Sequence, residues 1–195
     1  MKTFLIRHGQ TTGDVEDRFG GDYNDHLSEE GRLQAETLAE KLASEGIEII
    51  YCSPKIRALE TAEILKQKLH CKTETIDDLR ERNQYGVLTG MIKAEAKEKY
   101  PKLAELLKNY RNCLPDAESY ESLKERVLIA LNKLVSDYKT IAVVTHGGPI
   151  KAVIRKILGK EIEEIKIEDC GYAVLEKNGD SLRLEKTEGI TIGDK

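Results

Sequence analysis

The stretch Thr3-Phe4-Leu5-Ile6, followed directly by Arg7-His8-Gly9, decides the fold class of this chain. Four apolar or β-branched residues in a row are typical of a strand buried on both faces of a parallel sheet. Residues 141–144 repeat the pattern ahead of Thr145-His146-Gly147, and residues 47–51 give a weaker version that Glu48 interrupts. We therefore predict a buried strand at each of these three positions.

Helix signals lie between and after these strands. Ser28, with two glutamates after it, predicts an N-cap and an acidic first turn for a helix that runs to Gly46. Ser53-Pro54 predicts a second N-cap with proline at the first helical position. Apolar stripes at helical spacing lie at residues 58, 62, 65 and 69, at 123, 127, 131, 134 and 138, and at 150, 153, 154, 157 and 158, where Gly159 ends the helix. This alternation predicts an α/β fold with helices on both faces of a mostly parallel sheet.

Two regions depart from the alternation. Residues 171–175 and 181–184, on either side of Asn178-Gly179, predict a hairpin. Residues 83–118 hold two short helical patterns around Pro101, and we expect this insertion to lie over one end of the sheet. The chain of 195 residues shows no repeat, low-complexity tract or linker, so we expect a single domain over residues 1–195.

Composition and charge exclude several classes of function. A net charge of −4 leaves no strong basic field that would hold nucleic acid or an acidic membrane. No apolar run is long enough to cross a bilayer, and the first residues lack the pattern of a signal peptide, so we expect a cytoplasmic protein. The four cysteines lie far apart without a C-x-x-C pair, which predicts reduced thiols and argues against a zinc site.

Polar residues follow the predicted strands at their carboxyl ends. Arg7-His8-Gly9 closes the first strand, Ser53-Pro54 closes the second with Arg57 one helical turn on, and Thr145-His146-Gly147 closes the third. Ligands of open α/β sheets bind beyond these ends, so we expect the three clusters to converge on one crevice. Arginine forks match phosphoryl oxygens in pairs, and helix N-termini at the second and third clusters add N–H donors. The clusters therefore predict a cation-rich phosphate pocket.

Such a pocket suits phosphoryl transfer through a histidine. An imidazole can attack phosphorus near neutral pH, and the arginines can hold the charge that builds on the phosphoryl oxygens. Glu81, among basic neighbours, offers a carboxyl group to protonate the leaving alkoxide. A plainer interpretation stays open at this point, in which Arg57 is a solvated helix residue and Glu81 a surface ion pair. His26 and His70 fit ordinary surface or core histidines, and Cys52 fits a small buried hydrophobe.

Taken together, these residues resemble those of a known family, the histidine phosphatase superfamily, also called the phosphoglycerate mutase-like family. A lone R-H-G is a weak signal, but five blocks in the right order over nearly the whole chain are specific. The matching residues are Leu5 to Thr11 with Arg18, Phe19 and Gly21; Leu27, Ser28, Gly31, Gln34 and Ala35; Ser53, Pro54, Arg57, Ala58, Thr61 and Ala62; Leu79, Arg80 and Glu81 with Tyr85, Gly86 and Gly90; and Glu118, Ser119 and Arg126, followed by Thr145, His146 and Gly147.

The resemblance implies a three-layer α/β/α sandwich and a role for each site residue. His8 would be the phosphorylated nucleophile, and Glu81 the proton donor that later activates water. The phosphate pocket would be completed by Arg7, Thr11, Arg57, His146 and Gly147. The resemblance also implies that no metal or organic cofactor takes part.

The chain departs from the family pattern near the pocket. Asp14 stands where the family usually has an asparagine that helps bind phosphate, and Gly13 stands where it often has a bulky aromatic residue. We weigh three roles for Asp14. It points away and pairs with Arg18, it selects a substrate with a cationic or hydroxyl group for which Gly13 leaves room, or it caps its own loop backbone.

The pocket wall beside the proton donor Glu81 also departs from the family pattern. An extra residue, Asn83 or Gln84, separates Glu81 from Tyr85-Gly86 when the chain is compared with the family pattern. We therefore expect a differently shaped pocket wall and include Tyr85 among the candidates for substrate selection.

The leading hypothesis is a phosphatase, a phosphoric monoester hydrolase, whose partner is a small phosphorylated metabolite. The second is a cofactor-dependent phosphoglycerate mutase, for which Lys108 and Arg111 are candidates for a second phosphate clamp. The third is a catalytically inactive regulatory member, which the presence of all five expected catalytic residues disfavours. A phosphohistidine phosphatase is a further alternative, although retention of Glu81 favours an oxygen ester. The physiological substrate and the choice between a monomer and a homodimer stay open.

Overall fold

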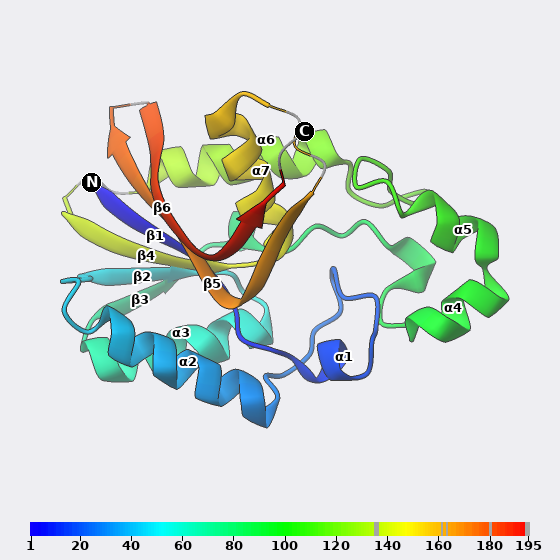
Figure 1. Cartoon of the computed structure of the whole chain (residues 1–195), viewed down its shortest axis with the longest axis horizontal. Coiled ribbons are helices and arrows are strands. Elements are labelled where there is room, and N and C mark those ends of the chain that lie inside the picture. The colour runs from blue at the N-terminus through cyan, green and yellow to red at the C-terminus, as the bar shows by residue number, and fades with distance from the viewer. Residues whose placement is uncertain (135–136, 161, 163, 180, 194–195) are drawn as a thin grey trace.

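The computed structural model describes residues 1–134, 137–160, 162, 164–179 and 181–193. Its centre is one sheet of six strands in the order β3-β2-β4-β1-β5-β6 (Figure 1). The strands are β1 (Lys2–Arg7), β2 (Ile49–Cys52), β3 (Lys72–Thr75), β4 (Thr140–Thr145), β5 (Ile165–Asn178) and β6 (Ser181–Ile192). The three strands predicted from the sequence are β1, β2 and β4, and they lie side by side in the middle of the sheet.

The sheet is parallel on one side and antiparallel on the other. β1 and β2 both pair in parallel with β4, and β3 pairs in parallel with β2. β5 runs antiparallel to β1 and forms a hairpin with β6. The predicted hairpin is therefore confirmed, but both strands extend beyond residues 171–175 and 181–184, and the pairing shifts register on the way.

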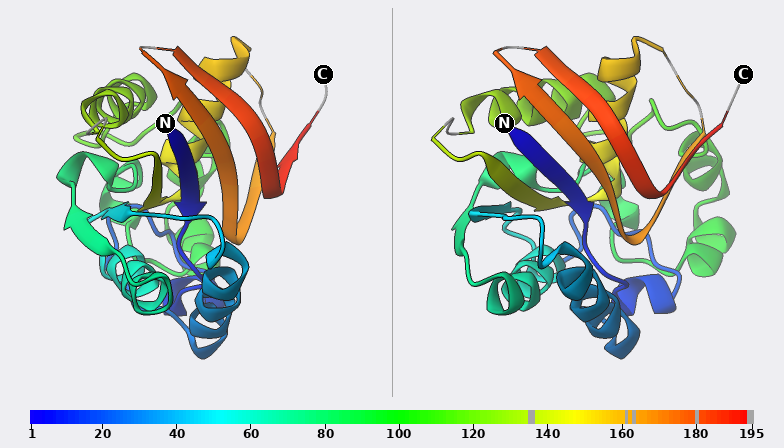
Figure 2. Two further views of the ribbon diagram at one scale, coloured as in Figure 1. Left: turned by 90° about the vertical axis from the view of Figure 1, so that its left-hand side faces the viewer. Right: turned by 60° about the vertical axis from the view of Figure 1, so that its left-hand side comes forward.

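Helices cover both faces of the sheet and make three layers (Figure 2). On β1, Phe4 and Ile6 pack into one core with α2 (Glu29–Leu42) and α3 (Ile56–Leu69), while Leu5 packs into the other. The opposite face is covered by α6 (Tyr120–Lys133) and α7 (Gly147–Leu158). A strand between two apolar cores has no solvent face, which explains its unbroken run of apolar residues. The predicted three-layer α/β/α sandwich is confirmed.

Two predicted helix ends are wrong. Ser28 does cap α2, since its Oγ accepts from the N–H of Gly31, but the helix ends at Leu42, and Gly46 lies just after the following turn at φ +69°. α3 begins at Ile56, with Lys55 as its N-cap, and not at Ser53-Pro54. The Ser53 hydroxyl accepts from the N–H of Lys55 at 3.2 Å and from Nε2 of His146, and it caps no helix.

The two later apolar stripes predicted one helix correctly and one helix that is too long. α7 ends at Gly159, which adopts φ +63°, and this prediction is confirmed. α6 is shorter than its stripe, because Lys133 is its last residue. Leu134 and Tyr138 still pack against the core from outside the helix. Residues 135–136, which the stripe also spans, lie outside the described residues.

The insertion lies beside the sheet at its carboxyl end and has a small core of its own. It contains the short helices η2 (Gly86–Leu88), α4 (Lys93–Lys99) and α5 (Pro101–Leu106), at the right of Figure 1. Leu88, Ala96 and Leu114 form its buried cluster together with Phe19, which follows the short helix α1 (Thr12–Val15). The helix η1 (Asp77–Leu79) leads from β3 toward the insertion.

None of the described helices combines the length and the apolar character needed to cross a bilayer.

Candidate active site

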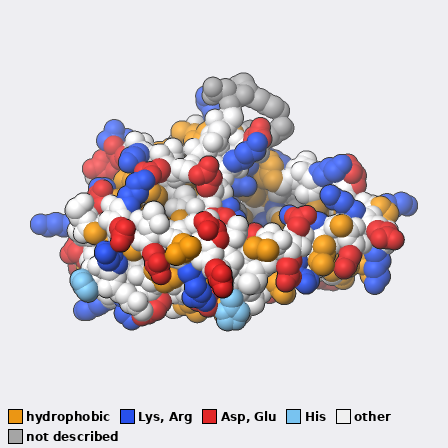
Figure 3. Space-filling view, turned by 60° about the horizontal axis from the view of Figure 1, so that its bottom comes forward, with side chains coloured by type: hydrophobic (Ala, Val, Ile, Leu, Met, Phe, Trp, Pro, Cys, Tyr) orange, Lys and Arg blue, Asp and Glu red, His pale blue; other side chains and the backbone are white. Residues whose placement is uncertain are grey.

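A cavity of about 440 Å³ lies where β1 ends, between the first turns of α7 and the insertion. Figure 3 shows the surface hollowed beside the insertion, with Lys and Arg side chains around the hollow. The predicted site residues that line it are Arg7, His8, Thr11, Asp14, Arg18, Arg57, Glu81, Tyr85 and Gly147. The three polar clusters thus converge as the strand pattern predicted.

His8 is held in one tautomer at the floor of this cavity. Its Nδ1 lies 2.8 Å from the carbonyl oxygen of Gly9, and a carbonyl can only accept, so the ring proton is on Nδ1. Nε2 therefore carries the lone pair, and it accepts from Nε of Arg57 at 3.1 Å. The nitrogen equipped to act as a nucleophile is thus beside the buried guanidinium.

Local packing fixes the backbone that carries His8. Its N–H bonds to the carbonyl of Thr145 at 3.1 Å and extends the pairing of β1 with β4. A Cβ on Gly9 would lie 2.4 Å from the carbonyl oxygen of Gly31, so this position requires glycine. The N–H of Gly9 also donates to Thr61 on α3 at 3.2 Å.

His146 is fully buried and contacts the same guanidinium. Its Nδ1 accepts from Nε of Arg57 at 3.2 Å, which places the ring proton on Nε2, where it donates to Oγ of Ser53 at 2.7 Å. The rings of His8 and His146 are 5.0 Å apart, edge to face. His146 does not line the cavity itself, so in this structure it acts on the pocket through its neighbours.

Both imidazoles are kept uncharged by their surroundings. Burial lowers the pKa of His8 well below its ordinary value, and the charges of Arg57 and Arg7 lower it further. Burial and Arg57 likewise hold the pKa of His146 well below its ordinary value. A neutral His8 keeps its Nε2 lone pair at physiological pH, which a nucleophile requires.

Arg57 is buried and anchored by the loop after α1. Its Nη1 donates to the carbonyl of Tyr23 at 2.6 Å and to the carboxylate of Asp25 at 2.9 Å, and its Nη2 donates to the carbonyl of Gly21 at 3.0 Å. The sequence did not single out Asp25. A Cβ on Gly13 would lie 2.4 Å from this carboxylate. The space at Gly13 is therefore taken by Asp25, and the expectation that it leaves room for a substrate group is wrong.

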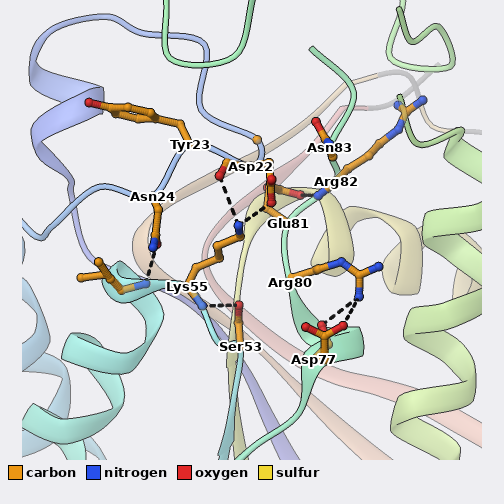
Figure 4. Close-up of polar contacts among 12 residues, drawn as sticks. Asp22, Tyr23, Asn24, Ser53, Lys55, Asp77, Arg80, Glu81, Arg82 and Asn83 are labelled. Carbon is orange, nitrogen blue, oxygen red and sulfur yellow. Dashed lines mark hydrogen bonds and ion pairs between the residues drawn. The ribbon is translucent and has the colours of Figure 1, made fainter. Parts of the chain in front are cut away.

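The same loop is tied to the start of α3. Figure 4 shows Lys55 reaching Asp22, with which it forms an ion pair. The side chain of Asn24 accepts from the N–H of Ile56 at 3.0 Å. These bonds occupy the N-terminus of α3, so the predicted N–H donors for phosphate are not found at Ser53.

Arg7 carries its guanidinium into the cavity from the end of β1. Its Nη1 donates to the carbonyl of Ile167 at 2.6 Å, and its Nη2 lies 3.0 Å from the carboxylate of Asp169. Asp14 approaches the same nitrogen at 3.9 Å. Burial raises the pKa of Asp169, and Arg7 opposes this shift. Ile167 and Asp169, at the register shift of β5, thus hold the Arg7 guanidinium in position.

Asp14 has the capping geometry that was one of its three expected roles. Its carboxylate accepts from the N–H and the hydroxyl of Thr11, whose Oγ accepts in turn from the N–H of Asp14. The expected pair with Arg18 is not formed. Arg18 instead pairs with Glu16 and donates to the carbonyl of Gly90 at 2.6 Å. Its side chain therefore ties α1 to the insertion.

Glu81 enters the cavity opposite the first turn of α7. Its two carboxyl oxygens accept from the N–H of Arg82 at 2.7 Å and from the N–H of Gly148 at 3.1 Å. A Cβ on Gly148 would lie 2.2 Å from Oε1 of Glu81, so this close approach requires glycine. The helix N-terminus at Gly147 therefore contributes a donor to the acid, where phosphate contacts were expected.

Arg126 holds the segment around Glu81 in place. It donates to the carbonyls of Asp78, Arg80 and Glu81 at 2.7–3.1 Å and pairs with Glu118 at 2.6 Å. This is the physical reason why the Glu118 and Arg126 block accompanies the acid. Figure 4 shows Arg80 itself turned outward to Asp77.

Several cavity residues were not predicted from the sequence. Those with charged or aromatic side chains are Asp25, Arg82, Lys93, Tyr110, Tyr120, Lys151 and Arg155. Lys151 and Arg155 lie between the apolar positions of α7, where charged residues are typical of a solvent-exposed helix face. The spacing of Gly147, Lys151 and Arg155, four residues apart, would have placed them on one helix face.

The described residues hold no group of three or more His, Cys, Asp or Glu side chains arranged to bind a metal ion. Independence from metals stays a prediction for experiment.

Comparison with known proteins agrees with this geometry. The family model of the histidine phosphatase superfamily (branch 1) matches residues 3–188. The chain belongs to this superfamily. A metal-independent phosphoserine phosphatase of Arabidopsis thaliana is 32% identical, over 78% of this chain and 67% of that protein. A 2,3-bisphosphoglycerate-dependent phosphoglycerate mutase of Staphylococcus saprophyticus is 30% identical, over 100% of this chain and 98% of that protein.

Solved structures of similar fold are known. Bacillus stearothermophilus YhfR superposes with a TM-score of 0.87 at 25% identity, covering 96% of each chain. Membership of the superfamily and relatives named as phosphatases support an enzyme that acts on phosphate esters.

Proposed function

We propose that this protein is a metal-independent phosphatase that hydrolyses small phosphomonoesters through a phosphohistidine at His8. The observation that carries the proposal is the fixed tautomer of His8, whose Nε2 lone pair lies 3.1 Å from Nε of the buried Arg57. A nucleophile beside a cation is what attack on a phosphate dianion needs, because the cation offsets the repulsion between lone pair and anion. The cavity has the size of a small-molecule site.

The first step forms a bond from Nε2 of His8 to phosphorus while the ester P–O bond breaks. Glu81, in its protonated form, gives its proton to the leaving oxygen. Arg7 and Arg57 hold the charge on the phosphoryl oxygens during the transfer. His146 contributes by donating to Ser53 and accepting from Arg57, which orients the guanidinium between the two rings.

The second step releases phosphate. Glu81, now a carboxylate, takes a proton from a water molecule whose oxygen attacks phosphorus, and the P–N bond breaks. This returns His8 to its neutral form and Glu81 to its acid form. The bonds from Arg82 and Gly148 to both carboxyl oxygens hold the group in position for both transfers.

A phosphoglycerate mutase is the second candidate, because a relative with this name matches 100% of this chain. A mutase must also bind a second phosphate. The two residues that the sequence suggested for that task do not line the cavity: Lys108 is 71% exposed and pairs with Glu105, and Arg111 lies against Tyr110. This favours hydrolysis.

The deciding experiment is a screen of phosphorylated metabolites in EDTA, each followed for inorganic phosphate and for isomerised product. We expect phosphate release without isomerisation and without loss of rate in EDTA. Isomerised product formed faster than phosphate would identify a mutase. Activity that disappears in EDTA and returns with a divalent metal would refute metal independence. The absence of both products would favour a catalytically inactive regulatory member.

A further inference from the structure

Lys151 is a cavity cation that the proposed chemistry does not use. It lies on α7 one helical turn after Gly147, and both residues line the cavity. The charges of Glu81 and Arg7 both act on its ammonium, which therefore faces the same cavity as the proton donor. Neither a carboxylate within ion-pair distance nor a hydrogen-bond acceptor of its ammonium is found among the described residues.

An ammonium without a partner among the described residues is unusual in the surroundings of Lys151. Burial lowers its pKa, Arg155 and Arg7 act in the same direction, and only Glu81 opposes the shift. Other cavity cations are matched: Arg7 with Asp169, Arg57 with Asp25, and Lys93 with Asp17 at 2.5 Å. A half-buried ammonium with no partner is costly unless a ligand supplies the anion.

A second polar group that lines the cavity also lacks a partner among the described residues. Tyr120 lines the cavity and is 5% exposed, and its hydroxyl has no hydrogen-bond partner among the described residues. A buried hydroxyl normally has one. Tyr120 meets Tyr110 edge to face at 5.0 Å, and the Arg155 guanidinium lies 3.9 Å from the centre of the Tyr110 ring. Arg155 thus binds the insertion to α7.

We propose that Lys151 and the Tyr120 hydroxyl form a subsite for a carboxylate of the substrate, so that the enzyme acts on phosphomonoesters of small hydroxy or amino acids. One ammonium and one hydroxyl suit a monoanionic carboxylate better than a second phosphate dianion. The inference rests on the proposed function for the identity of the reacting group, but it concerns binding and is tested by binding.

The test uses two pairs of esters that differ only in the carboxylate. These are 3-phosphoglycerate with glycerol 3-phosphate, and O-phosphoserine with O-phosphoethanolamine. Calorimetry with the His8→Ala variant gives Kd without turnover. We expect the carboxylated member of at least one pair to bind about 10- to 100-fold more tightly, as for a hydrogen-bonded ion pair. In the double variant His8→Ala/Lys151→Met this ratio should fall toward 1, and with Lys151→Arg most of it should return.

Lys156→Met is the matched control, because Lys156 is an exposed lysine of the same helix outside the cavity. It should leave the Kd ratio unchanged. If His8→Ala does not unfold cooperatively, the same ratios come from competition of the four esters against p-nitrophenyl phosphate in enzyme with an intact His8.

Ratios below about 2 in both pairs, or a ratio that survives Lys151→Met, would overturn the subsite. Failure of the carboxylated esters to bind at millimolar concentration would overturn it as well. The proposed function fails separately, if wild-type enzyme releases no phosphate from p-nitrophenyl phosphate or from any of the four esters while the Kd ratio persists.

Discussion

The two ends of the cavity are built differently. At the phosphate end, His8, His146 and Arg57 are all at most 5% exposed, and each is bonded to another of the three. They stand on the central strands and on α3, between two large apolar cores. Elsewhere in the cavity, Lys151 on α7 and the hydroxyl of Tyr120 on α6 have no partner among the described residues. The catalytic side chains are therefore positioned before substrate binds, whereas the proposed carboxylate subsite needs the substrate to supply its missing partner.

The sharpest test of this contrast is removal of the nucleophile. His8→Ala should lower kcat for every phosphomonoester by at least about a thousandfold, because the step it removes has no substitute. Lys151→Met should change kcat/KM only for carboxylated esters, by about 10- to 100-fold. Steady-state kinetics on p-nitrophenyl phosphate and 3-phosphoglycerate measure both. Comparable losses from the two variants on both substrates would mean that the ends of the cavity are not functionally distinct.

The second prediction concerns the acid. Glu81→Gln should lower turnover of esters with alkoxide leaving groups by about 10²–10⁴-fold and affect p-nitrophenyl phosphate far less, because nitrophenolate leaves without a proton. Gly148→Ala should reproduce this leaving-group dependence, since its Cβ would displace the carboxyl group.

Gly147→Ala is the paired control for the acid, because no described atom lies within 4 Å of its added Cβ. It should not steepen the dependence on the leaving group. Equal losses on both kinds of ester in Glu81→Gln would show that Glu81 has a structural role only.

Much of the phosphate end could be predicted from the sequence, because strand ends in an open α/β sheet converge and each buried strand is followed directly by its polar residues. The errors arose where a residue has a distant partner. Ser53 reads as a helix cap but bonds to His146, and Gly13 reads as free space but accommodates Asp25. Such contacts between residues far apart in sequence leave no local pattern. The partnerless state of Lys151 is likewise visible only in the fold.

The third prediction concerns pH and the buried histidines. Both have a lowered pKa in the folded protein, so below pH 6.5 the unfolded chain binds protons that the folded protein does not. Stability should therefore fall as pH drops from 6.5 toward 5, by up to about 1.4 kcal/mol per pH unit for each histidine. Thermal unfolding across this range should show a smaller decrease in Tm for His146→Gln than for wild type. Identical pH dependence in both would mean that His146 is not buried in its neutral form.

The smallest expected effect is at Asp14. Its carboxylate lies 3.9 Å from Arg7 and is partly exposed, so its repulsion of a bound phosphate is near the value for water, about 1 kcal/mol at 4 Å. Asp14→Asn should therefore lower the inhibition constant of inorganic phosphate by up to about fivefold, while the amide oxygen retains the cap on Thr11. An unchanged inhibition constant would show that the Asp14 carboxylate lies too far from the bound phosphate to repel it.

The most direct measurement is to trap the phosphorylated enzyme. Wild-type protein in EDTA is mixed with a ³²P-labelled ester, quenched within milliseconds and digested, and the labelled residue is identified alongside His8→Ala and His146→Ala. We predict an acid-labile, base-stable phosphoryl group on His8 that is absent from His8→Ala and still detectable in His146→Ala. Label that persists in His8→Ala and disappears in His146→Ala would contradict the assignment of His8 as the nucleophile.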